Sequence, residues 1–354
     1  TPYYFYKHTT TGKAMVSTFD GTSWINIGNT EFSGGNISYP FMFVNQSSTP
    51  YALYMDSENT GAGYDKCTVN KLNGSTWELV GQRQFSSQSC YLGRLAFKPD
   101  GDPVLFNSLG AASDVWDFNG SSWNQITTSG LDIATADGTN YGAVASNGDI
   151  YWAHKDSAGK ARVDVYNGSS WSTLGGGSIP SNPIKQYVHM VLDSQDIPYV
   201  SFKDETDDAI VVYAYKSSAW EKLGGVDVDT IGDTLHASAR IDVDSNDNIY
   251  IVYINSTNNY TVKKYDGSSW YTIEENFATN KDTGAAFYTH PSFGVTNDSD
   301  IFVGYWKSTS NAQVSVSKNN FAISIPENNN SALIDVSQFT SDSDGDTLTY
   351  SISG

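Results

Sequence analysis

The sequence predicts an all-β fold in which one four-stranded unit is used repeatedly, and three observations support this prediction. The first is a five-residue pattern, Asn/Asp-Gly-Ser/Thr-Ser/Thr-Trp, whose aromatic positions are 53, 46, 48, 49, 50 and 51 residues apart. The second is another turn signal upstream of each copy. The third is the composition, with 31 glycines and 14% aromatic residues in 354. A fixed period of this size is typical of one supersecondary unit used many times.

The repeated pattern is expected to form a tight turn between two strands. Clear copies end at Trp24, Trp77, Trp123, Trp171 and Trp270, and degraded copies end at Trp220 and Phe321. Asn-Gly or Asp-Gly between alternating runs is the strongest short hairpin signal, because a two-residue type I′ turn needs positive φ at both central residues. We therefore predict a two-residue hairpin at each copy. Because the Trp is present in nearly every copy, we interpret it as a residue that packs one unit against the next.

A second hairpin upstream of each copy brings the unit to four strands, which we name a, b, c and d in chain order. It is clearest at Lys98-Pro99-Asp100-Gly101-Asp102-Pro103 and at Asp244-Ser245-Asn246-Asp247. Apolar residues flank the second of these turns, and no segment of the chain shows helical periodicity. Four antiparallel strands, repeated about seven times, describe a β-propeller. A solenoid is the competing fold, but its repeats are usually shorter.

The strand count favours seven blades, with six as the alternative. Thr1-Pro2-Tyr3 aligns with Thr49-Pro50-Tyr51, which begins a b strand, so the first blade lacks its innermost strand a. Either the chain is cut upstream, or a segment elsewhere supplies that strand. We assign residues 1–325 to the propeller. We assign residues 326–354 to a linker or to the truncated N-terminal part of a second domain.

Composition excludes several functions. A net charge of −19 and a pI near 4.4 argue against nucleic-acid binding, which needs surfaces rich in Lys and Arg. No stretch is long and apolar enough to span a membrane, and the five histidines are too dispersed to form a metal site. The two cysteines, Cys67 and Cys90, are expected on one face of the disc. A disulfide between them is conceivable there, but their spacing does not fix it.

Two resemblances follow from these motifs. The Gly/Trp turns resemble the Asp-box and similar turn motifs of sialidase-like and lectin propellers, although Asp or Asn is here adjacent to Gly. The segment that starts at Pro326-Glu327-Asn328 resembles the opening strands of bacterial cadherin-like domains, which occur on large secreted or surface proteins and often bind Ca²⁺. This second resemblance implies Glu327, Asp342, Asp344 and Asp346 as candidate Ca²⁺ ligands. A polar turn without metal is the alternative. No cofactor is expected for the propeller.

The candidate binding residues are those in which the blades differ. Counting ten residues back from the first apolar residue of each b strand reaches one repeat-equivalent position in strand a, occupied by Phe41, Arg94, Tyr141, His189, Arg240 and Ser292. Strand a lines the axis of a propeller, so two of the four arginines are expected there, beside Tyr141 and His189. Asp242 could neutralise Arg240. Alternatively, the guanidinium groups could bind an anionic group such as a uronate or a sulfate.

A second set of candidate ligand-binding residues lies on the same face. It comprises residues near the starts of the a strands and in the b–c loops: Tyr39, Tyr187, His290, Asp56 and Asp204. Aromatic rings beside Asp and Asn suit sugars, because apolar sugar faces stack on rings and hydroxyls take fixed hydrogen bonds. Ordinary solvated loops would explain these residues equally well.

The leading hypothesis is therefore an extracellular, lectin-like or adhesin-like module of a larger secreted or surface bacterial protein, which binds a glycan or polysaccharide as a monomer. The alternative is a lyase or glycoside hydrolase that acts on acidic polysaccharide. A lyase would use Tyr141, His189, Arg94 and Arg240, whereas a hydrolase needs paired carboxylates that nothing singles out. A third possibility is a structural propeller or one that binds a surface protein.

Overall fold

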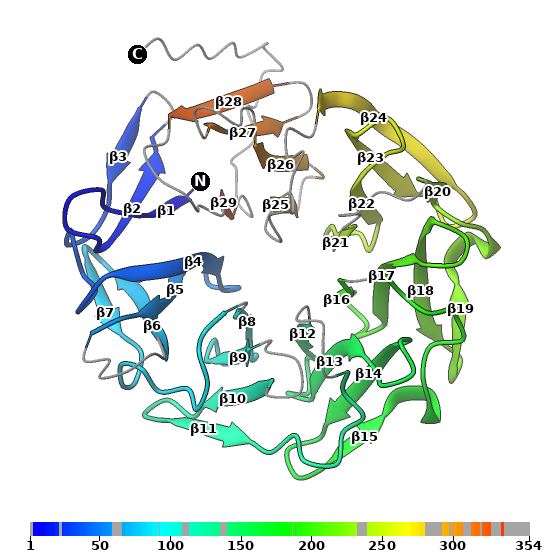
Figure 1. Ribbon diagram of the computed structural model, residues 1–354, viewed down its shortest axis with the longest axis horizontal. Coiled ribbons are helices and arrows are strands. Elements are labelled where there is room, and N and C mark those ends of the chain that lie inside the picture. The colour runs from blue at the N-terminus through cyan, green and yellow to red at the C-terminus, as the bar shows by residue number, and fades with distance from the viewer. Residues whose placement is uncertain are drawn as a thin grey trace.

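The computed structural model describes residues 3–20, 23–58, 66–91, 93–107, 113–134, 140–185, 187–231, 239–279, 292–296, 299, 301–306, 313–318, 321–326 and 334–335. These residues form seven antiparallel sheets arranged in a ring, so the chain is a β-propeller (Figure 1). Among them, the only helical segments are two short 3₁₀ turns, η1 (Leu174–Gly176) and η2 (Leu223–Gly225). None of the described helices could cross a membrane.

Each sheet runs from an inner strand beside the axis to an outer strand at the rim (Figure 1). The first three sheets contain β1 (Tyr3–Lys7), β2 (Ala14–Phe19), β3 (Trp24–Asn26); β4 (Ile37–Val44), β5 (Pro50–Asp56), β6 (Lys66–Asn73), β7 (Thr76–Leu79); β8 (Arg94–Phe97), β9 (Pro103–Asn107), β10 (Asp114–Phe118), β11 (Trp123–Ile126). The fourth and fifth contain β12 (Tyr141–Val144), β13 (Ile150–Lys155), β14 (Ala161–Tyr166), β15 (Trp171–Thr173); β16 (His189–Leu192), β17 (Pro198–Asp204), β18 (Ala209–Lys216), β19 (Ala219–Lys222), with β20 (Asp229–Thr230) added beside β18. The last two contain β21 (Arg240–Val243), β22 (Ile249–Ile254), β23 (Asn259–Tyr265), β24 (Trp270–Thr279); β25 (Ser292–Val295), β26 (Ile301–Trp306), β27 (Gln313–Lys318), β28 (Phe321–Pro326).

The inner strand of the first sheet comes from the far end of the sequence. β29 (Ile334–Asp335) pairs antiparallel with β1, with Ile334 opposite Tyr4 and Asp335 opposite Tyr3. A segment elsewhere in the chain therefore supplies the missing strand, which was one of the two alternatives. Part of the segment expected to begin a cadherin-like domain belongs to the propeller's first sheet. A separate domain at 326–354 stays a prediction.

The two-residue hairpin expected for each copy is present where Asn73 pairs with Thr76, but four other Gly/Trp turns close differently. In these four copies, the backbone N–H of the Asn or Asp donates to the carbonyl of the Ser just before Trp, as in Asn119 to Ser122 at 3.1 Å. The Asn119 side chain accepts the N–H groups of Ser121 and Ser122 at 3.1 and 2.9 Å. Because this side chain organises the loop, only Gly120 has positive φ, at 87°. The degraded copy does have two positive-φ central residues, Ser217 and Ser218.

The repeated Trp joins neighbouring blades, as predicted. In five successive blades its indole N–H donates to a backbone carbonyl of the preceding blade: Trp77 to Ile27, Trp123 to Val80, Trp171 to Thr127, Trp220 to Leu174 and Trp270 to Leu223, at 2.8–3.4 Å. A glycine follows the acceptor at four of these junctions. Gly81 shows why, because its φ is 73° and an added Cβ would lie 2.9 Å from Cδ1 of Trp123. The glycine therefore lets the Trp reach the backbone of the blade before it.

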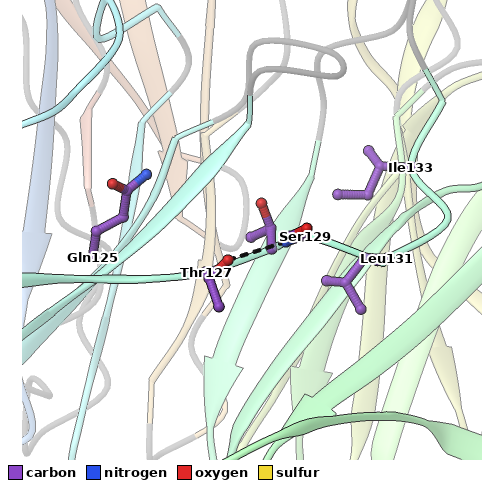
Figure 2. A pocket seen from close by; sticks show the side chains of 7 residues that line it. Gln125, Thr127, Ser129, Leu131 and Ile133 are labelled. Atoms are coloured by element: carbon purple, nitrogen blue, oxygen red, sulfur yellow. Dashed lines mark hydrogen bonds between the residues drawn. The ribbon is translucent and has the colours of Figure 1, made fainter.

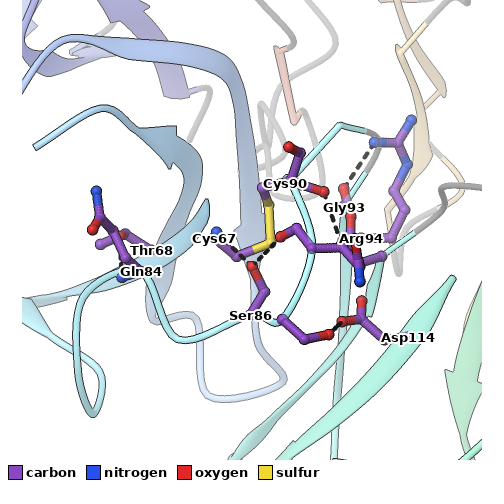
Figure 3. Close-up of a disulfide and its surroundings, with 12 residues drawn as sticks. Cys67, Thr68, Gln84, Ser86, Cys90, Gly93, Arg94 and Asp114 are labelled. Carbon is purple, nitrogen blue, oxygen red and sulfur yellow. Dashed lines mark hydrogen bonds between the residues drawn. A yellow bond between two sulfur atoms is a disulfide. The ribbon is translucent and has the colours of Figure 1, made fainter. Parts of the chain in front are cut away.

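The hydrophobic core lies between the blades. One cluster joins Leu53 and Val69 of the second sheet to Leu95 and Leu105 of the third, and similar clusters occupy other junctions. In the first of these, Cys67 and Cys90 form a disulfide, with their Cα atoms 4.8 Å apart (Figure 3). The bridge ties the start of β6 to the loop that leads into β8. The inner strand that carries Arg94 is thus attached covalently to the neighbouring blade.

Candidate functional site

The six residues at the repeat-equivalent position lie on six inner strands, with Ser292 opposite Gly304, and the other five carry larger side chains. Each pairs with the residue twelve positions later in strand b: Phe41 with Leu53, Arg94 with Phe106, Tyr141 with Ala153, His189 with Ser201, and Arg240 with Val252. The register therefore confirms the repeat equivalence inferred from spacing. The inner strands surround the axis (Figure 1), so their equivalent register places these five residues at one level of the ring. We call them the inner-ring cluster.

Arg94 and Arg240 influence each other across the axis. β12 and β16 separate their strands in the ring, yet the Arg240 cation acts on Arg94. Burial, the largest cause, and the Arg240 cation together lower the pKa of Arg94 to about 10, and Tyr141 opposes both effects. Burial likewise lowers the pKa of Arg240. Both groups are still cationic at neutral pH, so two positive charges share a partly dehydrated space.

Neither arginine forms an ion pair with any carboxylate among the described residues. Arg94 donates to the carbonyl of Gly93 at 3.0 Å, and its Cζ lies 4.4 Å from the ring centre of Phe41. Nε of Arg240 is buried and has no hydrogen-bond partner in the described part of the chain. A buried, charged donor without a partner is unfavourable and calls for an explanation, such as a ligand.

Asp242, the proposed partner of Arg240, is engaged elsewhere. Its carboxylate accepts the N–H of Val243 at 2.9 Å and that of Val295, in the next sheet, at 2.7 Å. It therefore joins two adjacent inner strands instead of neutralising Arg240. The interpretation of Arg240 as one half of a structural ion pair was wrong for this partner. Alternation places Asp242 on the same face as Arg240, as expected, but a backbone N–H of β25 binds the Asp242 carboxylate.

Tyr141 and His189 complete the cluster. Their ring centres are 3.6 Å apart, and the Tyr141 hydroxyl forms a hydrogen bond with Arg240 that raises the arginine's pKa against the effect of burial. His189 is buried, and the N–H of Ile241 points to its Nδ1 at 3.5 Å. A neutral His189 would then carry its proton on Nε2. The cluster thus combines two cations, one phenol and one imidazole.

The loop carboxylates do not join this cluster. Asp56 is fully buried and forms an ion pair with Arg83 at 3.2 Å, and it also accepts the N–H groups of Gly35 and Glu58. Asp204 accepts the N–H groups of Thr206 and Asp207. Both carboxylates hold b–c loops in shape. Their role in ligand binding stays a prediction.

Tyr39 and Tyr187 lie two residues before Phe41 and His189, at the N-terminal ends of their inner strands. Both have a left-handed backbone, with φ of 49° and 62°. His290 and the proposed Ca²⁺ ligands, Glu327, Asp342, Asp344 and Asp346, fall outside the described residues. Within the described part of the chain, no three His, Cys, Asp or Glu side chains are grouped as a metal site would require.

A cavity of about 510 Å³ follows β11 at the rim (Figure 2). Its lining includes Gln125, Thr127, Thr128, Ser129, Leu131 and Ile133. The N–H of Ser129 donates to Oγ1 of Thr127 at 3.3 Å, and no titratable side chain contributes. Sequence reasoning missed this cavity. One signal in the sequence could have pointed to it. Four other copies of the repeat have glycine four residues after Trp, whereas this copy has Thr127.

Comparison with known proteins supports the fold. No family model and no curated protein sequence matches this chain. A protein from Lactobacillus plantarum has 14% identity and a TM-score of 0.57, over 92% of this chain and 97% of its own. A variant of the Aleuria aurantia lectin in complex with Fucalpha1-6GlcNAc has 14% identity and a TM-score of 0.52, over 78% and 90%.

A third similar structure is a polysaccharide lyase, an ulvan lyase bound to -[GlcA(1-4)Rha3S]-. It has 11% identity and a TM-score of 0.53, over 83% of this chain and 85% of its own. All three resemblances are in the fold. The chain is thus a β-propeller of the general kind found in lectins and in polysaccharide lyases.

Proposed function

We propose that this propeller is a carbohydrate-binding module that holds an acidic group of a glycan between Arg94 and Arg240. One observation carries the proposal: two guanidinium groups on inner strands lie close enough for the Arg240 cation to lower the pKa of Arg94, and neither has an ion-paired carboxylate among the described residues. A bound carboxylate or sulfate would relieve their repulsion and could accept from the buried Nε of Arg240. The chain as a whole has a net charge of −19, so two arginines on the inner strands stand out from an otherwise acidic protein.

The comparisons support this class of ligand. One similar propeller binds a fucosylated sugar, and another binds a glycan with both a uronate and a sulfate. A disulfide, an acidic surface and a glycan ligand are together consistent with a secreted or surface-attached protein, which is the location we propose. Ca²⁺ binding by the C-terminal segment, a monomeric state and a bacterial adhesin role remain parts of this proposal.

Calorimetric titration with uronic, sulfated and neutral oligosaccharides tests the proposal. The acidic ligands should bind, and Arg240→Ala should weaken them by at least about tenfold, the effect of losing one charge-assisted hydrogen bond. Lys216→Ala is the matched control, because it removes one positive charge from a c–d hairpin on the opposite face. Equal binding of neutral and acidic sugars, or no effect of Arg240→Ala, would refute the proposed site.

A second candidate function is elimination by a uronate lyase. It is favoured by Tyr141, whose hydroxyl is hydrogen-bonded to Arg240 while its ring contacts His189. An arginine would neutralise the uronate, and a phenol or imidazole would take the proton from C5 as the C4–O bond breaks and a C4–C5 double bond forms. The departing oxygen then takes up a proton. Growth of ultraviolet absorbance from the unsaturated product would establish the lyase, whereas binding without turnover would support the lectin.

A further inference from the structure

Tyr39 lies in a β-bulge with an unfavourable backbone. The register of β4 against β5 shifts between Ser38 and Phe41, and Tyr39 within this bulge has a φ of 49°. A bulky residue rarely adopts a positive φ, and a residue before proline, as Tyr39 is, favours extended conformations. Bulges that redirect a side chain are common next to functional sites. The conformation therefore suggests that the direction of this ring matters.

The bulge brings Tyr39 against a tyrosine of the next blade. The ring centres of Tyr39 and Tyr91 are 4.7 Å apart, with 47° between their planes. Both rings are half-buried and pack on the core that contains Phe41, Leu95 and the disulfide. Cys90, next to Tyr91, is held by that bridge. The pair is consequently fixed from two directions and keeps part of its surface exposed. We call Tyr39 and Tyr91 the tyrosine pair.

The tyrosine pair packs on the same core cluster as Phe41, the ring that Arg94 covers. Phe41, two residues after Tyr39 on β4, places its ring 4.4 Å from Cζ of Arg94. Tyr91 is three residues before Arg94 in the chain. Two residues along a strand span about 7 Å. The same blade junction thus carries both an aromatic pair and a guanidinium group.

The same kind of backbone recurs farther around the ring. Tyr187, two residues before His189, has a φ of 62°. Tyr39 and Tyr187 are the only aromatic residues with positive φ among the described residues. The two unfavourable conformations therefore share one offset from the inner-ring cluster, at the N-terminal ends of their strands. Such outliers cluster at binding sites, where the surrounding structure maintains them.

We propose that the tyrosine pair is a stacking subsite for the sugar that adjoins the acidic one, which makes the protein selective for oligosaccharides over acidic monosaccharides. This inference rests on the proposed binding of an acidic group at Arg94 and Arg240. The rings would contact the apolar face of the neighbouring sugar, and Tyr is suited to this because it offers a large, rigid surface. The ligand class is then an acidic polysaccharide segment of at least two units.

The test compares a uronic monosaccharide with an oligosaccharide built from the same unit, by calorimetric titration. Wild-type protein should bind the oligosaccharide about tenfold more tightly, the gain expected from one stacking contact. Tyr91→Ala should abolish this gain and leave the monosaccharide affinity unchanged, whereas Tyr91→Phe should keep it. Tyr271→Ala, at an exposed position on β24, is the matched control and should change neither value.

The variant Tyr39→Gly separates a loss of binding from a loss of folding. Glycine accepts the left-handed backbone of Tyr39 without strain, which offsets part of the packing lost with the half-buried ring, so the protein should stay folded while the oligosaccharide gain disappears. A variant that melts earlier and keeps the gain would show that the ring serves only the core and would overturn the inference. Failure of wild-type protein to bind either ligand would instead refute the proposed function itself.

Discussion

Arg94 and Arg240 occupy the same repeat position on inner strands that are not neighbours, yet each lies close enough for the Arg240 cation to lower the pKa of Arg94. Only the curvature of a closed ring brings these strands face to face (Figure 1). Without a bound anion, the repulsion between these two cations should destabilise the folded protein. Several consequences of this arrangement, and of the blade junctions, can be measured.

Replacing Arg240 should stabilise the protein without ligand. Arg240→Met removes one of two like charges and the buried Nε that has no described partner. Because the side chain is only half-buried, we expect a gain of about 1 kcal/mol in the free energy of unfolding by urea at low salt. Lys216→Met should be nearly neutral. A clear loss of stability in Arg240→Met would show that structural contacts hold this arginine.

Gly81→Ala should weaken the junction between the second and third blades. An alanine would be strained at a φ of 73°, and its Cβ would lie 2.9 Å from Trp123. We expect the free energy of unfolding to fall by about 2 kcal/mol, with roughly half from the backbone. Gly74→Ala separates the two effects, because Gly74 has a φ of 60° and nothing near its Cβ. Equal losses in both variants would contradict the steric part of this explanation.

Asp266→Asn should make the protein more tolerant of acid. Hydrogen bonds from the N–H groups of Ser269 and Ser268 lower the pKa of Asp266 to about 2. A lowered folded-state pKa contributes stability above the unfolded pKa of about 3.9, which is lost as pH falls toward 2. Asn119 and Asn167 show that asparagine forms the same turn. The variant should match wild type at pH 7 and unfold at lower pH in an acid titration, and Asn119→Asp should do the reverse.

Loss of the disulfide should affect the blade junction that carries Arg94. The bridge closes a loop between cysteines 23 residues apart, and Figure 3 shows Arg94 beyond Cys90 and Gly93. The double variant Cys67→Ala/Cys90→Ala should lose about 3 kcal/mol in the free energy of unfolding. Wild-type protein in excess reductant should unfold at the same urea concentration as the variant. A loss below about 1 kcal/mol would mean that the surrounding core already fixes this loop.

The repeat made much of this architecture predictable. A regular period identifies equivalent residues, so the sequence could place Arg94, Tyr141, His189 and Arg240 at one level of the ring before any coordinates. It could also assign Trp123 to a blade junction. Both predictions use information that recurs in every blade and is therefore insensitive to local exceptions.

Features that occur once could not be predicted in this way. The bulge at Tyr39 depends on the packing of one strand, and the engagement of Asp242 with Val295 depends on a neighbouring blade. The way most Gly/Trp turns close was missed because the Asn119 side chain accepts hydrogen bonds from the N–H groups of Ser121 and Ser122. These bonds hold the loop without positive φ at two central residues. No periodic signal marks the short strand β29.

The pairing of β29 with β1 also has a consequence for biosynthesis. Tyr3 can pair with Asp335 only after the ribosome has synthesised residue 335. The first sheet therefore lacks its inner strand while all the intervening blades are being made. During synthesis, the edge of β1 would be open to pairing with other chains. The pairing that closes the ring should consequently be slow, and a nascent chain should need protection from aggregation until β29 has emerged from the ribosome.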